Sequence, residues 1–261
     1  MLEAKLSEAA ILKRLLDAVK ELVSDANFEC NEEAITLQAM DNSHVALVAV
    51  KLEASGFKRY RCDRAIPLGV NLGSLTKVLK CAKDDDILTL KATDDADILS
   101  LTYEAKSTYT DRIAEYEMKL MDIDADTLGI PDTEYDASVT LPSAEFSRIV
   151  RDLSLLGESV RIEVSKEGIR FVSDGEAANG NILLRQSAEA APKKGSSGVR
   201  IEMNQAVTLT FSLKYLVNFS KSSTLSKKVQ LMMSNDVPLL VSYEFNQGHI
   251  RYYLAPKIGD D

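Results

Sequence analysis

The stretch Met118-Lys-Leu-Met-Asp-Ile-Asp-Ala-Asp-Thr-Leu-Gly-Ile-Pro-Asp-Thr-Glu-Tyr135 divides the chain into two segments of similar length. It carries five acidic side chains against the single basic residue Lys119, and its apolar residues are irregularly spaced. Gly129 and Pro131 prevent a helix or a central strand from running through this stretch. The composition predicts a linker that also offers a surface to other proteins.

The segments on either side of this linker repeat one order of predicted elements: a strand, a helix, several strands, a second helix and further strands. The match is clearest late in each half, where Asp97-Ile-Leu-Ser-Leu-Thr-Tyr-Glu104 parallels Asp236-Val-Pro-Leu-Leu-Val-Ser-Tyr-Glu244. Tandem duplication is the natural interpretation. We expect a first domain over 1–118, a connecting loop over 119–136 and a second domain over 137–261.

Four helices are predicted from apolar residues that recur with a period of 3.6. They begin near Glu8, Leu72, Ser143 and Ser212, with Ser7 and Ser143 as the expected N-caps of the first and third. Segments of alternating polarity between them predict antiparallel strands. The expected fold class is α+β, with two domains that each pack two helices on one side of antiparallel sheets.

Composition limits the function classes. Hydrophobic residues make up 45% and charged residues 27% of the 261 residues, as in soluble globular proteins. No apolar run is long enough to span a membrane, and the first residues do not resemble a secretion signal. Three cysteines without metal-ligand spacing predict free thiols in a reducing compartment. The net charge of -9 alone would disfavour a polyanionic ligand.

That inference depends on where the charges lie. The predicted helices carry nine basic and four acidic side chains, a net charge of +5. Because the whole chain has a net charge of -9, the rest of the chain must carry -14. Two interpretations remain open: each helix has an ordinary solvated face, or the four helices jointly face a polyanion, with contacts to phosphates that carry no sequence information. The basic residues are Lys13, Arg14, Lys20, Lys77, Lys80, Arg148, Arg151, Lys214 and Lys221.

Catalytic and cofactor motifs are absent from the sequence. There is no phosphate-binding loop, dinucleotide fingerprint, nucleophile elbow or zinc-protease motif, and only two histidines exist. Asp122 to Asp126 resembles the start of a calcium loop but lacks its later glycine and glutamate, so a solvated linker is favoured. The aspartates at 84–86 and 94–95 are better explained by turns. We therefore expect no cofactor, no metal and no enzymatic activity.

Six blocks spread over the whole chain closely resemble the eukaryotic sliding clamps of the proliferating cell nuclear antigen family. The blocks are Leu37-Gln-Ala-Met-Asp-Asn-Ser-His44, Tyr60-Arg-Cys-Asp-Arg64, Gly69-Val-Asn-Leu72, Tyr116-Glu-Met-Lys-Leu-Met-Asp122, Leu128-Gly-Ile-Pro131 and Tyr252-Tyr-Leu-Ala-Pro-Lys-Ile258. The resemblance implies a nuclear homotrimeric ring that encircles double-stranded DNA without sequence preference. The nine basic helix residues would line its hole, and sheets would form its outside.

The same resemblance implies three further sites. Partner peptides, as in DNA polymerases and the clamp loader, would dock on a pocket formed by Met40, His44, Val45, Leu47, Leu128, Ile130, Pro238, Tyr253, Ala255 and Pro256. Subunits would join by pairing two edge strands through Asp111, Ile113, Tyr116 and Glu117 on one side and Glu176, Asn179, Gly180 and Leu183 on the other. Lys166 matches the family's acceptor of ubiquitin and SUMO.

The departures from the family pattern are few. Leu155 stands where some relatives carry a polar channel residue, and the 190–198 loop is basic at Lys193 and Lys194. Three other interpretations stay open at this point: a subunit of a heterotrimeric checkpoint clamp, a metal-dependent enzyme that uses the aspartate clusters, and a scaffold that does not bind DNA.

Overall fold

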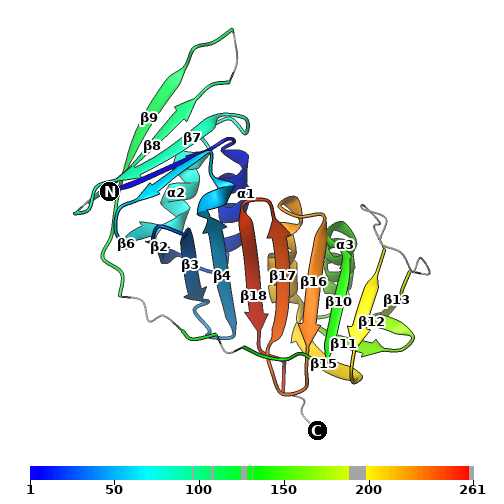
Figure 1. The fold of residues 1–261 in the computed structure, drawn as a ribbon. Coiled ribbons are helices and arrows are strands. Elements are labelled where there is room, and N and C mark those ends of the chain that lie inside the picture. The colour runs from blue at the N-terminus through cyan, green and yellow to red at the C-terminus, as the bar shows by residue number, and fades with distance from the viewer. Residues whose placement is uncertain (96, 107–108, 125–127, 131, 188–197, 259–261) are drawn as a thin grey trace. The chain divides into compact units, whose positions relative to one another are not determined.

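The computed structural model describes residues 1–95, 97–106, 109–124, 128–130, 132–187 and 198–258 (Figure 1). Most of the basic 190–198 loop and part of the acidic linker, including the calcium-loop-like Asp126, lie outside the described residues. Contacts divide the chain into two compact units. Unit 1 contains Met1–Asn42, Val48–Gly129 and Phe245–Ile250, and unit 2 contains Ser43–Leu47, Ile130–Glu244 and Arg251–Asp261.

Unit 1 is built from antiparallel strands and two helices. One sheet has the strand order β5-β1-β7-β8-β9, and a second group has the order β4-β3-β2-β6. The helices are α1 (Ala10–Val19) and α2 (Leu72–Leu79), with a 3₁₀ turn, η1, at Ala54–Gly56. The strands are β1 (Leu2–Leu6), β2 (Asp25–Cys30), β3 (Ala34–Met40), β4 (Ala46–Glu53), β5 (Arg59–Cys62), β6 (Ile66–Asn71), β7 (Ile87–Ala92), β8 (Ile98–Glu104) and β9 (Ile113–Lys119).

Unit 2 repeats the same plan. Its strands have the orders β14-β10-β16-β17 and β13-β12-β11-β15, and its helices are α3 (Ser143–Ser154) and α4 (Leu213–Ser220), followed by the 3₁₀ turn η2 (Lys221–Thr224). The strands are β10 (Ala137–Pro142), β11 (Ser159–Ser165), β12 (Gly168–Asp174), β13 (Asn179–Leu184), β14 (Arg200–Met203), β15 (Val207–Ser212), β16 (Lys228–Met233) and β17 (Leu239–Phe245). The last strand is β18 (Gly248–Leu254), which is divided between the units after Ile250.

The order of elements confirms the predicted duplication. Each half of the chain reads strand, helix, five strands, helix, three strands, so β1 corresponds to β10, α1 to α3, β4 to β13, α2 to α4 and β9 to β18. The expected α+β class is thereby confirmed. The strand β2 is an addition to the prediction: it pairs with β3 on one side and with β6 on the other.

The starts of α1 and α3 correct the two predicted N-caps. Neither helix has a side-chain cap. Instead, the N–H groups of Ala9 and Ala10 donate to the carbonyls of Asp86 (2.8 Å) and Asp84 (3.0 Å), and the N–H of Ser143 donates to the carbonyl of Lys227 (2.9 Å). These acceptors satisfy donors that a helix start leaves unpaired, so Ser7 and Ser143 are not needed as caps.

The second helix of each unit is held in a related way. The N–H of Leu72 donates to the carbonyl of Ser24 (2.8 Å), and the N–H of Leu213 donates to the carbonyl of Glu158 (2.9 Å). Only α2 adds a side-chain cap, in which the Asn71 carboxamide oxygen accepts from the N–H of Ser74 at 2.9 Å. The matching bonds show that the duplication extends to the way in which neighbouring segments fix each helix.

Each unit buries the apolar stripe of both helices beneath its strands. Burying one such side chain contributes about 1.5–3 kcal/mol to folding, so the helix faces are strongly fixed. The buried residues include Leu12, Leu15, Leu16 and Val19 of α1, Leu72, Leu75 and Leu79 of α2, Phe146, Ile149, Val150 and Leu153 of α3, and Leu213, Leu216 and Phe219 of α4. The opposite faces of the helices are therefore the ones that reach solvent.

No helix in the described part of the chain is long and apolar enough to cross a membrane.

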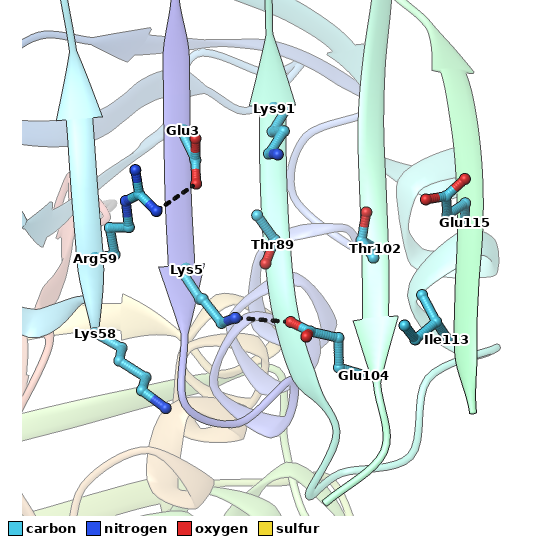
Figure 2. A pocket seen from close by; sticks show the side chains of 10 residues that line it. All are labelled: Glu3, Lys5, Lys58, Arg59, Thr89, Lys91, Thr102, Glu104, Ile113 and Glu115. Atoms are coloured by element: carbon cyan, nitrogen blue, oxygen red, sulfur yellow. Dashed lines mark ion pairs between the residues drawn. The ribbon is translucent and has the colours of Figure 1, made fainter. Parts of the chain in front are cut away.

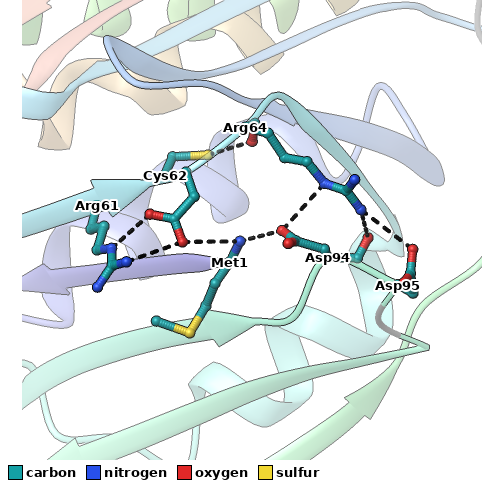
Figure 3. A network of polar contacts seen from close by, with 7 residues as sticks. Met1, Arg61, Cys62, Arg64, Asp94 and Asp95 are labelled. Carbon is teal, nitrogen blue, oxygen red and sulfur yellow. Dashed lines mark hydrogen bonds and ion pairs between the residues drawn. The ribbon is translucent and has the colours of Figure 1, made fainter.

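A chain of ion pairs joins the start of β1, the end of β5 and the turn after β7 (Figure 3). The Met1 ammonium contacts the carboxylates of Asp94 and Asp63, and Asp63 also accepts from Arg61 at 2.7 Å. The guanidinium of Arg64 lies 3.4 Å from Asp94. The hydrogen bond from Arg61 and the nearby Met1 ammonium hold the pKa of Asp63 below its ordinary value. The aspartate pair at 94–95 is therefore explained by turn and ion-pair contacts.

Candidate functional sites

The nine basic residues predicted on the helices all reach solvent, six of them within the helices, whereas Lys20 and Lys80 cap the ends of α1 and α2 and Lys221 follows α4. Lys13 and Lys20 are half-buried, and the other seven are exposed. The helical spacing that buries the apolar stripe places these side chains on the opposite face. The four helices thus share one property, a basic outer face, in a chain whose net charge is -9.

Some of these charges are already paired within their own unit. The Lys13 ammonium lies 2.6 Å from a carboxylate oxygen of Asp84 and donates to the carbonyl of Ala82 at 2.9 Å. Lys20 lies 2.8 Å from Asp17, and Arg148 lies 3.7 Å from Asp152. Lys77, Lys80 and Lys214 have no acidic partner among the described residues. The unpaired lysines are therefore the better candidates for contact with an external anion.

The acidic residues at 84–86 also have structural roles. Asp84 accepts from Lys13, and one oxygen of the buried Asp86 accepts from the Arg112 guanidinium at 2.6 Å and from the N–H of Lys83 at 2.9 Å. Over the described residues, no group of three or more His, Cys, Asp and Glu side chains is placed to hold a metal ion. Turn formation and ion pairing thus account for these acids.

Two strands predicted to join subunits lie at the edges of their sheets. β9 is the outer strand beyond β8, and β13 is the outer strand beyond β12. Within the described residues, each has a strand on one side only. Unpaired strand edges invite pairing with another chain. Of the eight residues predicted for the two edges, none is fully buried: Asp111, Ile113, Glu117, Glu176 and Asn179 are exposed, and Tyr116, Gly180 and Leu183 are half-buried.

The two faces of β9 differ. Figure 2 shows Ile113 and Glu115 on the outer face of the five-stranded sheet, where side chains surround a hollow of about 570 Å³. Two ion pairs cross this face, Lys5 to Glu104 at 2.8 Å and Arg59 to Glu3 at 3.6 Å. The alternate residue Tyr116 points to the helix side, where its ring centroid lies 5.1 Å from that of Tyr103.

Gly180 explains how closely α3 approaches β13. A Cβ at Gly180 would lie 2.6 Å from Leu153 Cδ2 and 2.9 Å from Leu156 Cδ1, both on the last turn of α3 and the segment that follows. A larger residue would fit only if these two leucine side chains shifted, so glycine permits the close approach. The end of α3 therefore lies directly against the edge strand.

The linker is tied along unit 1 by three hydrogen bonds that the sequence does not predict. The N–H of Met121 donates to the carbonyl of Gly69 at 2.8 Å, and the Asn27 side chain donates to the carbonyl of Ile123 at 2.8 Å. The Gln38 side chain donates to the carbonyl of Leu128 at 2.7 Å. A Cβ at Gly69 would lie 1.9 Å from Met121 O, so the first of these contacts requires glycine. The glycine in Gly69-Val-Asn-Leu72 is the only sequence signal of this anchoring.

The linker also exposes apolar side chains. Leu128 is 39% and Ile130 38% exposed, a high fraction for large aliphatic residues outside a core. In unit 2, Ile130 and Tyr253 line an open hollow of about 390 Å³ together with Tyr135, Met232, Leu240 and neighbouring polar residues. Such exposed apolar surface is typical of an interaction site.

The remaining residues of the predicted peptide pocket are also accessible at least in part. His44, Pro238 and Ala255 are exposed, and Met40, Val45, Leu47 and Pro256 are half-buried. His44 has a φ of 56°, a left-handed conformation that is uncommon outside glycine. In unit 2 the N–H of Ala255 donates to the carbonyl of Val45 at 3.1 Å, which holds the C-terminal segment beside the residue that precedes β4. Met40 is thus a surface-facing residue of its strand rather than a core residue.

Lys166 occupies the turn between β11 and β12 and is exposed. The hairpin around it is the one predicted from the sequence, and Gly168 closes it with a φ of 149°. The turn is held by a bond from the N–H of Glu167 to the Ser165 hydroxyl oxygen at 3.2 Å. The side chain of Lys166 is therefore presented at the tip of a hydrogen-bonded hairpin.

A duplicated α+β unit with antiparallel sheets, two helices in each half and basic outer helix faces defines the class of DNA clamps. Comparison with known proteins agrees. Residues 1–128 match the model of the proliferating cell nuclear antigen N-terminal domain, and residues 129–258 match that of its C-terminal domain. The proliferating cell nuclear antigen of Chaetomium thermophilum is 56% identical over 262 residues, covering all of both chains. The chain belongs to the proliferating cell nuclear antigen family.

This membership confirms the predicted class of function. Proteins of the family are DNA sliding clamps, which act as scaffolds for polymerases and repair proteins and are not enzymes. The chain is therefore a sliding clamp that serves DNA replication and repair. The heterotrimeric checkpoint clamp is not favoured, since the full-length relative is a proliferating cell nuclear antigen.

Proposed function

We propose that three copies of the chain close a nuclear ring around double-stranded DNA through pairing of β9 with β13. One observation carries this proposal. In unit 1, β4 is flanked by the segment Phe245–Ile250, with the N–H of Glu53 donating to the carbonyl of Gln247 at 2.8 Å. β13 is the duplicate of β4, and β9 is the duplicate of β18.

The duplicates of this flanked pair are the two strands with open edges. Among the described residues, β9 and β13 lack the partner that their counterparts have in unit 1. Pairing between subunits would repeat the same arrangement and remove both edges. A head-to-tail contact of this kind generates a closed ring when its rotation closes. Size exclusion with light scattering tests the ring, since a chain that stays monomeric at micromolar concentration would contradict it.

The basic faces of the four helices would then line the hole. Lysine and arginine side chains that contact phosphates provide affinity without sequence readout. A ring held on DNA by topology needs only weak contacts, which allow it to slide. The acidic remainder of the chain would disfavour DNA anywhere else. The proposed lining residues are the nine basic helix residues, with Lys77, Lys80 and Lys214 contributing unpaired charge.

Charge reversal of one lining residue from each helix tests this proposal. The variant Lys20→Glu, Lys77→Glu, Arg151→Glu, Lys214→Glu should remain trimeric and lose most of its stimulation of a polymerase on primed circular DNA. The matched control reverses four exposed lysines outside the helices, Lys58, Lys91, Lys227 and Lys228. It has the same net charge and should retain the stimulation. Equal loss in both variants would show that total charge, not the helix faces, governs loading.

The partner site is proposed at the exposed apolar residues of the linker and the neighbouring segments. Leu128, Ile130 and Tyr253 would accept the aliphatic and aromatic anchors of partner peptides, as apolar hot spots do. The other proposed contributors are Met40, His44, Val45, Leu47, Pro238, Ala255 and Pro256.

We also propose the domain boundaries expected from the sequence: 1–118 and 137–261 form the two clamp domains, and 119–136 connects them.

Lys166 is proposed as an acceptor of ubiquitin and SUMO. The support is its exposure at the tip of the β11–β12 hairpin, where a conjugating enzyme can reach its amine. Reconstituted conjugation on wild type and Lys166→Arg, with Lys58→Arg as an exposed-lysine control, tests this assignment. Modification that persists on Lys166→Arg would place the acceptor elsewhere.

A further inference from the structure

Three of the four most exposed large apolar residues in the described part of the chain lie near the two open strand edges, and the fourth, Ile258, lies in the C-terminal segment. Tyr109, just before β9, is 98% exposed, and Ile113 on β9 is 64% exposed. Leu155, at the end of α3, is 84% exposed. Single exposed apolar residues are common and need no explanation. Their occurrence at both edges that the proposed ring would cover indicates that these positions are shielded in the assembly.

Leu155 lies at the end of the basic face of α3. Spacings of seven and four residues place it on the same side of the helix as Arg148 and Arg151. An aliphatic side chain adds nothing to the attraction of phosphates, so the role of this face does not explain it. The neighbouring Leu153 and Leu156 pack against Gly180 of β13, so the end of α3 that carries Leu155 lies against that edge strand.

The opposite edge carries an incompletely covered aromatic cluster. Tyr116 on β9 is half-buried, its ring lies 5.1 Å from Tyr103, and a hydrogen bond with the Cys81 thiol raises the pKa of its phenol. Cys81, just after α2, is exposed. This cluster lies on the side of its sheet that faces the helices. Leu155, at the end of α3, likewise lies on the helix side of the sheet that contains β13.

The corresponding cluster in the second half of the chain, around Tyr252, is fully covered by other residues. Tyr252 has the inward place on β18 that Tyr116 has on β9, the Tyr243-Glu244 pair matches Tyr103-Glu104, and Ser222 follows the start of α4 as Cys81 follows the start of α2. The hydroxyls of Tyr252 and Ser222 are 2.7 Å apart, Tyr252 stacks on Phe219 at 4.4 Å, and Tyr252 is fully buried. Tyr116 has the corresponding tyrosine and thiol contacts, with Tyr103 and Cys81, but among the described residues no ring stacks on it as Phe219 stacks on Tyr252, and it remains partly open to solvent.

From this difference we infer that Leu155 is an apolar subunit contact that covers the Tyr116 and Cys81 cluster of the neighbouring copy. The inference rests on the proposed pairing of β9 with β13, because that pairing brings the helix ends of two copies to one side of a joined sheet. Burial of the Leu155 side chain between two copies would remove apolar surface from water, which stabilises the contact between them. Leu155 is thereby assigned to assembly rather than to contact with DNA.

The test measures the protein concentration at which half of the chains are trimeric, by sedimentation velocity. Leu155→Asp should weaken each interface about 10- to 100-fold, as expected for loss of one buried leucine, and should raise this concentration by at least that factor, because all three interfaces of the trimer are changed. Leu155→Met should stay within about threefold, since methionine keeps a similar apolar volume. Ile258→Asp is the matched control because Ile258 is 96% exposed and receives the same change. Thermal unfolding of the monomers should be unchanged, because Leu155 is not part of the core.

The possible outcomes separate this inference from the proposed ring. A wild-type trimer in which Leu155→Asp and Ile258→Asp have equal effects, or in which neither has any, would overturn the inference and leave the ring intact. A wild-type chain that is monomeric at micromolar concentration would overturn both. A shift confined to Leu155→Asp supports the assignment.

Discussion

The ammonium of Lys13 lies 2.6 Å from the carboxylate of Asp84, so one of the basic residues on α1 is neutralised inside its own unit. Lys77 on α2 has no such partner among the described residues. Residues that share a basic helix face are therefore unequal in the charge that they offer to an external polyanion. This difference is measurable, because each phosphate contact leaves a signature in the salt dependence of binding.

We expect Lys77→Gln to weaken binding to a short duplex and to reduce the slope of log affinity against log salt by about 1. Lys13→Gln should change the slope less, because Lys13 must leave Asp84 and Ala82 before it can contact a phosphate. Fluorescence anisotropy over a salt series checks both. Equal slopes for the two variants would contradict the assignment of unequal roles.

Acid should weaken the contact between Lys13 and Asp84. The hydrogen bond from Lys13 lowers the pKa of the Asp84 carboxyl. A lowered folded-state pKa stabilises the fold above the ordinary aspartate pKa of about 4, and this contribution is lost as the pH falls through the lowered value. Asp84→Asn should therefore cost a little stability at pH 7 and nothing at the lowest pH. Urea unfolding at several pH values measures this; a constant difference would contradict it. The effect should be small, because Asp84 is exposed to solvent.

Arg112→Met should destabilise unit 1 by about 3 kcal/mol, at the low end of values for breaking a buried ion pair. The reason is that Asp86 is 1% exposed and would keep a buried carboxylate with only the N–H of Lys83 as a partner. Asp86→Asn removes the charge, so Arg112→Met in that background should cost much less. Denaturant unfolding of the four proteins in this cycle checks the coupling. Additive effects would show that the pair is not coupled.

Gly69→Ala should detach the start of the linker. Its Cβ would lie 1.9 Å from Met121 O, so the hydrogen bond between Met121 and Gly69 cannot persist. Amide exchange at Met121 should become faster by about fivefold, as for loss of one hydrogen bond near 1 kcal/mol. Gly73→Ala is a suitable control, since its Cβ would approach only Asn71 Oδ1, at 3.4 Å. Unchanged exchange at Met121 would show that the linker start is held by other contacts.

Ile130→Ala should weaken binding of a synthetic partner peptide with aliphatic and aromatic anchors by about 5- to 30-fold, the range for an apolar contact of 1–2 kcal/mol. Ile98→Ala, on β8 and outside the proposed site, removes an isoleucine of similar exposure (40%) and should leave the affinity unchanged. Calorimetric titration measures both. If the two variants bind the peptide equally, the exposed residues of the linker are not the docking surface.

The fold was predictable wherever local pattern and tertiary contact agree. The helices and most strands follow from apolar periodicity, and the repeat of Asp97–Glu104 in Asp236–Glu244 reveals the duplication. β2 escapes prediction because Asp25 and Asn27 are residues that strands disfavour, and only pairing with β3 and β6 makes the segment a strand. The helix starts escape it because backbone carbonyls distant in sequence replace the side-chain caps.

The candidate sites divide in the same way. The basic helix faces follow from composition and spacing, whereas the strand edges and the peptide pocket came from family resemblance. Sequence alone does not show that Lys13 is paired with Asp84 or that Gly180 brings α3 to the edge of β13. These depend on distances between elements, for which a single sequence has no signal.

The tethering of the linker has a thermodynamic consequence for a protein that serves many partners. Its backbone is held at Met121, Ile123 and Leu128 by Gly69, Asn27 and Gln38 before any partner arrives. Fixing a free residue costs roughly 1–2 kcal/mol of conformational entropy. That cost is met during folding rather than at each encounter, so short peptides of modest contact area can still bind measurably. A succession of partners can then exchange on a strip that does not have to be ordered anew each time.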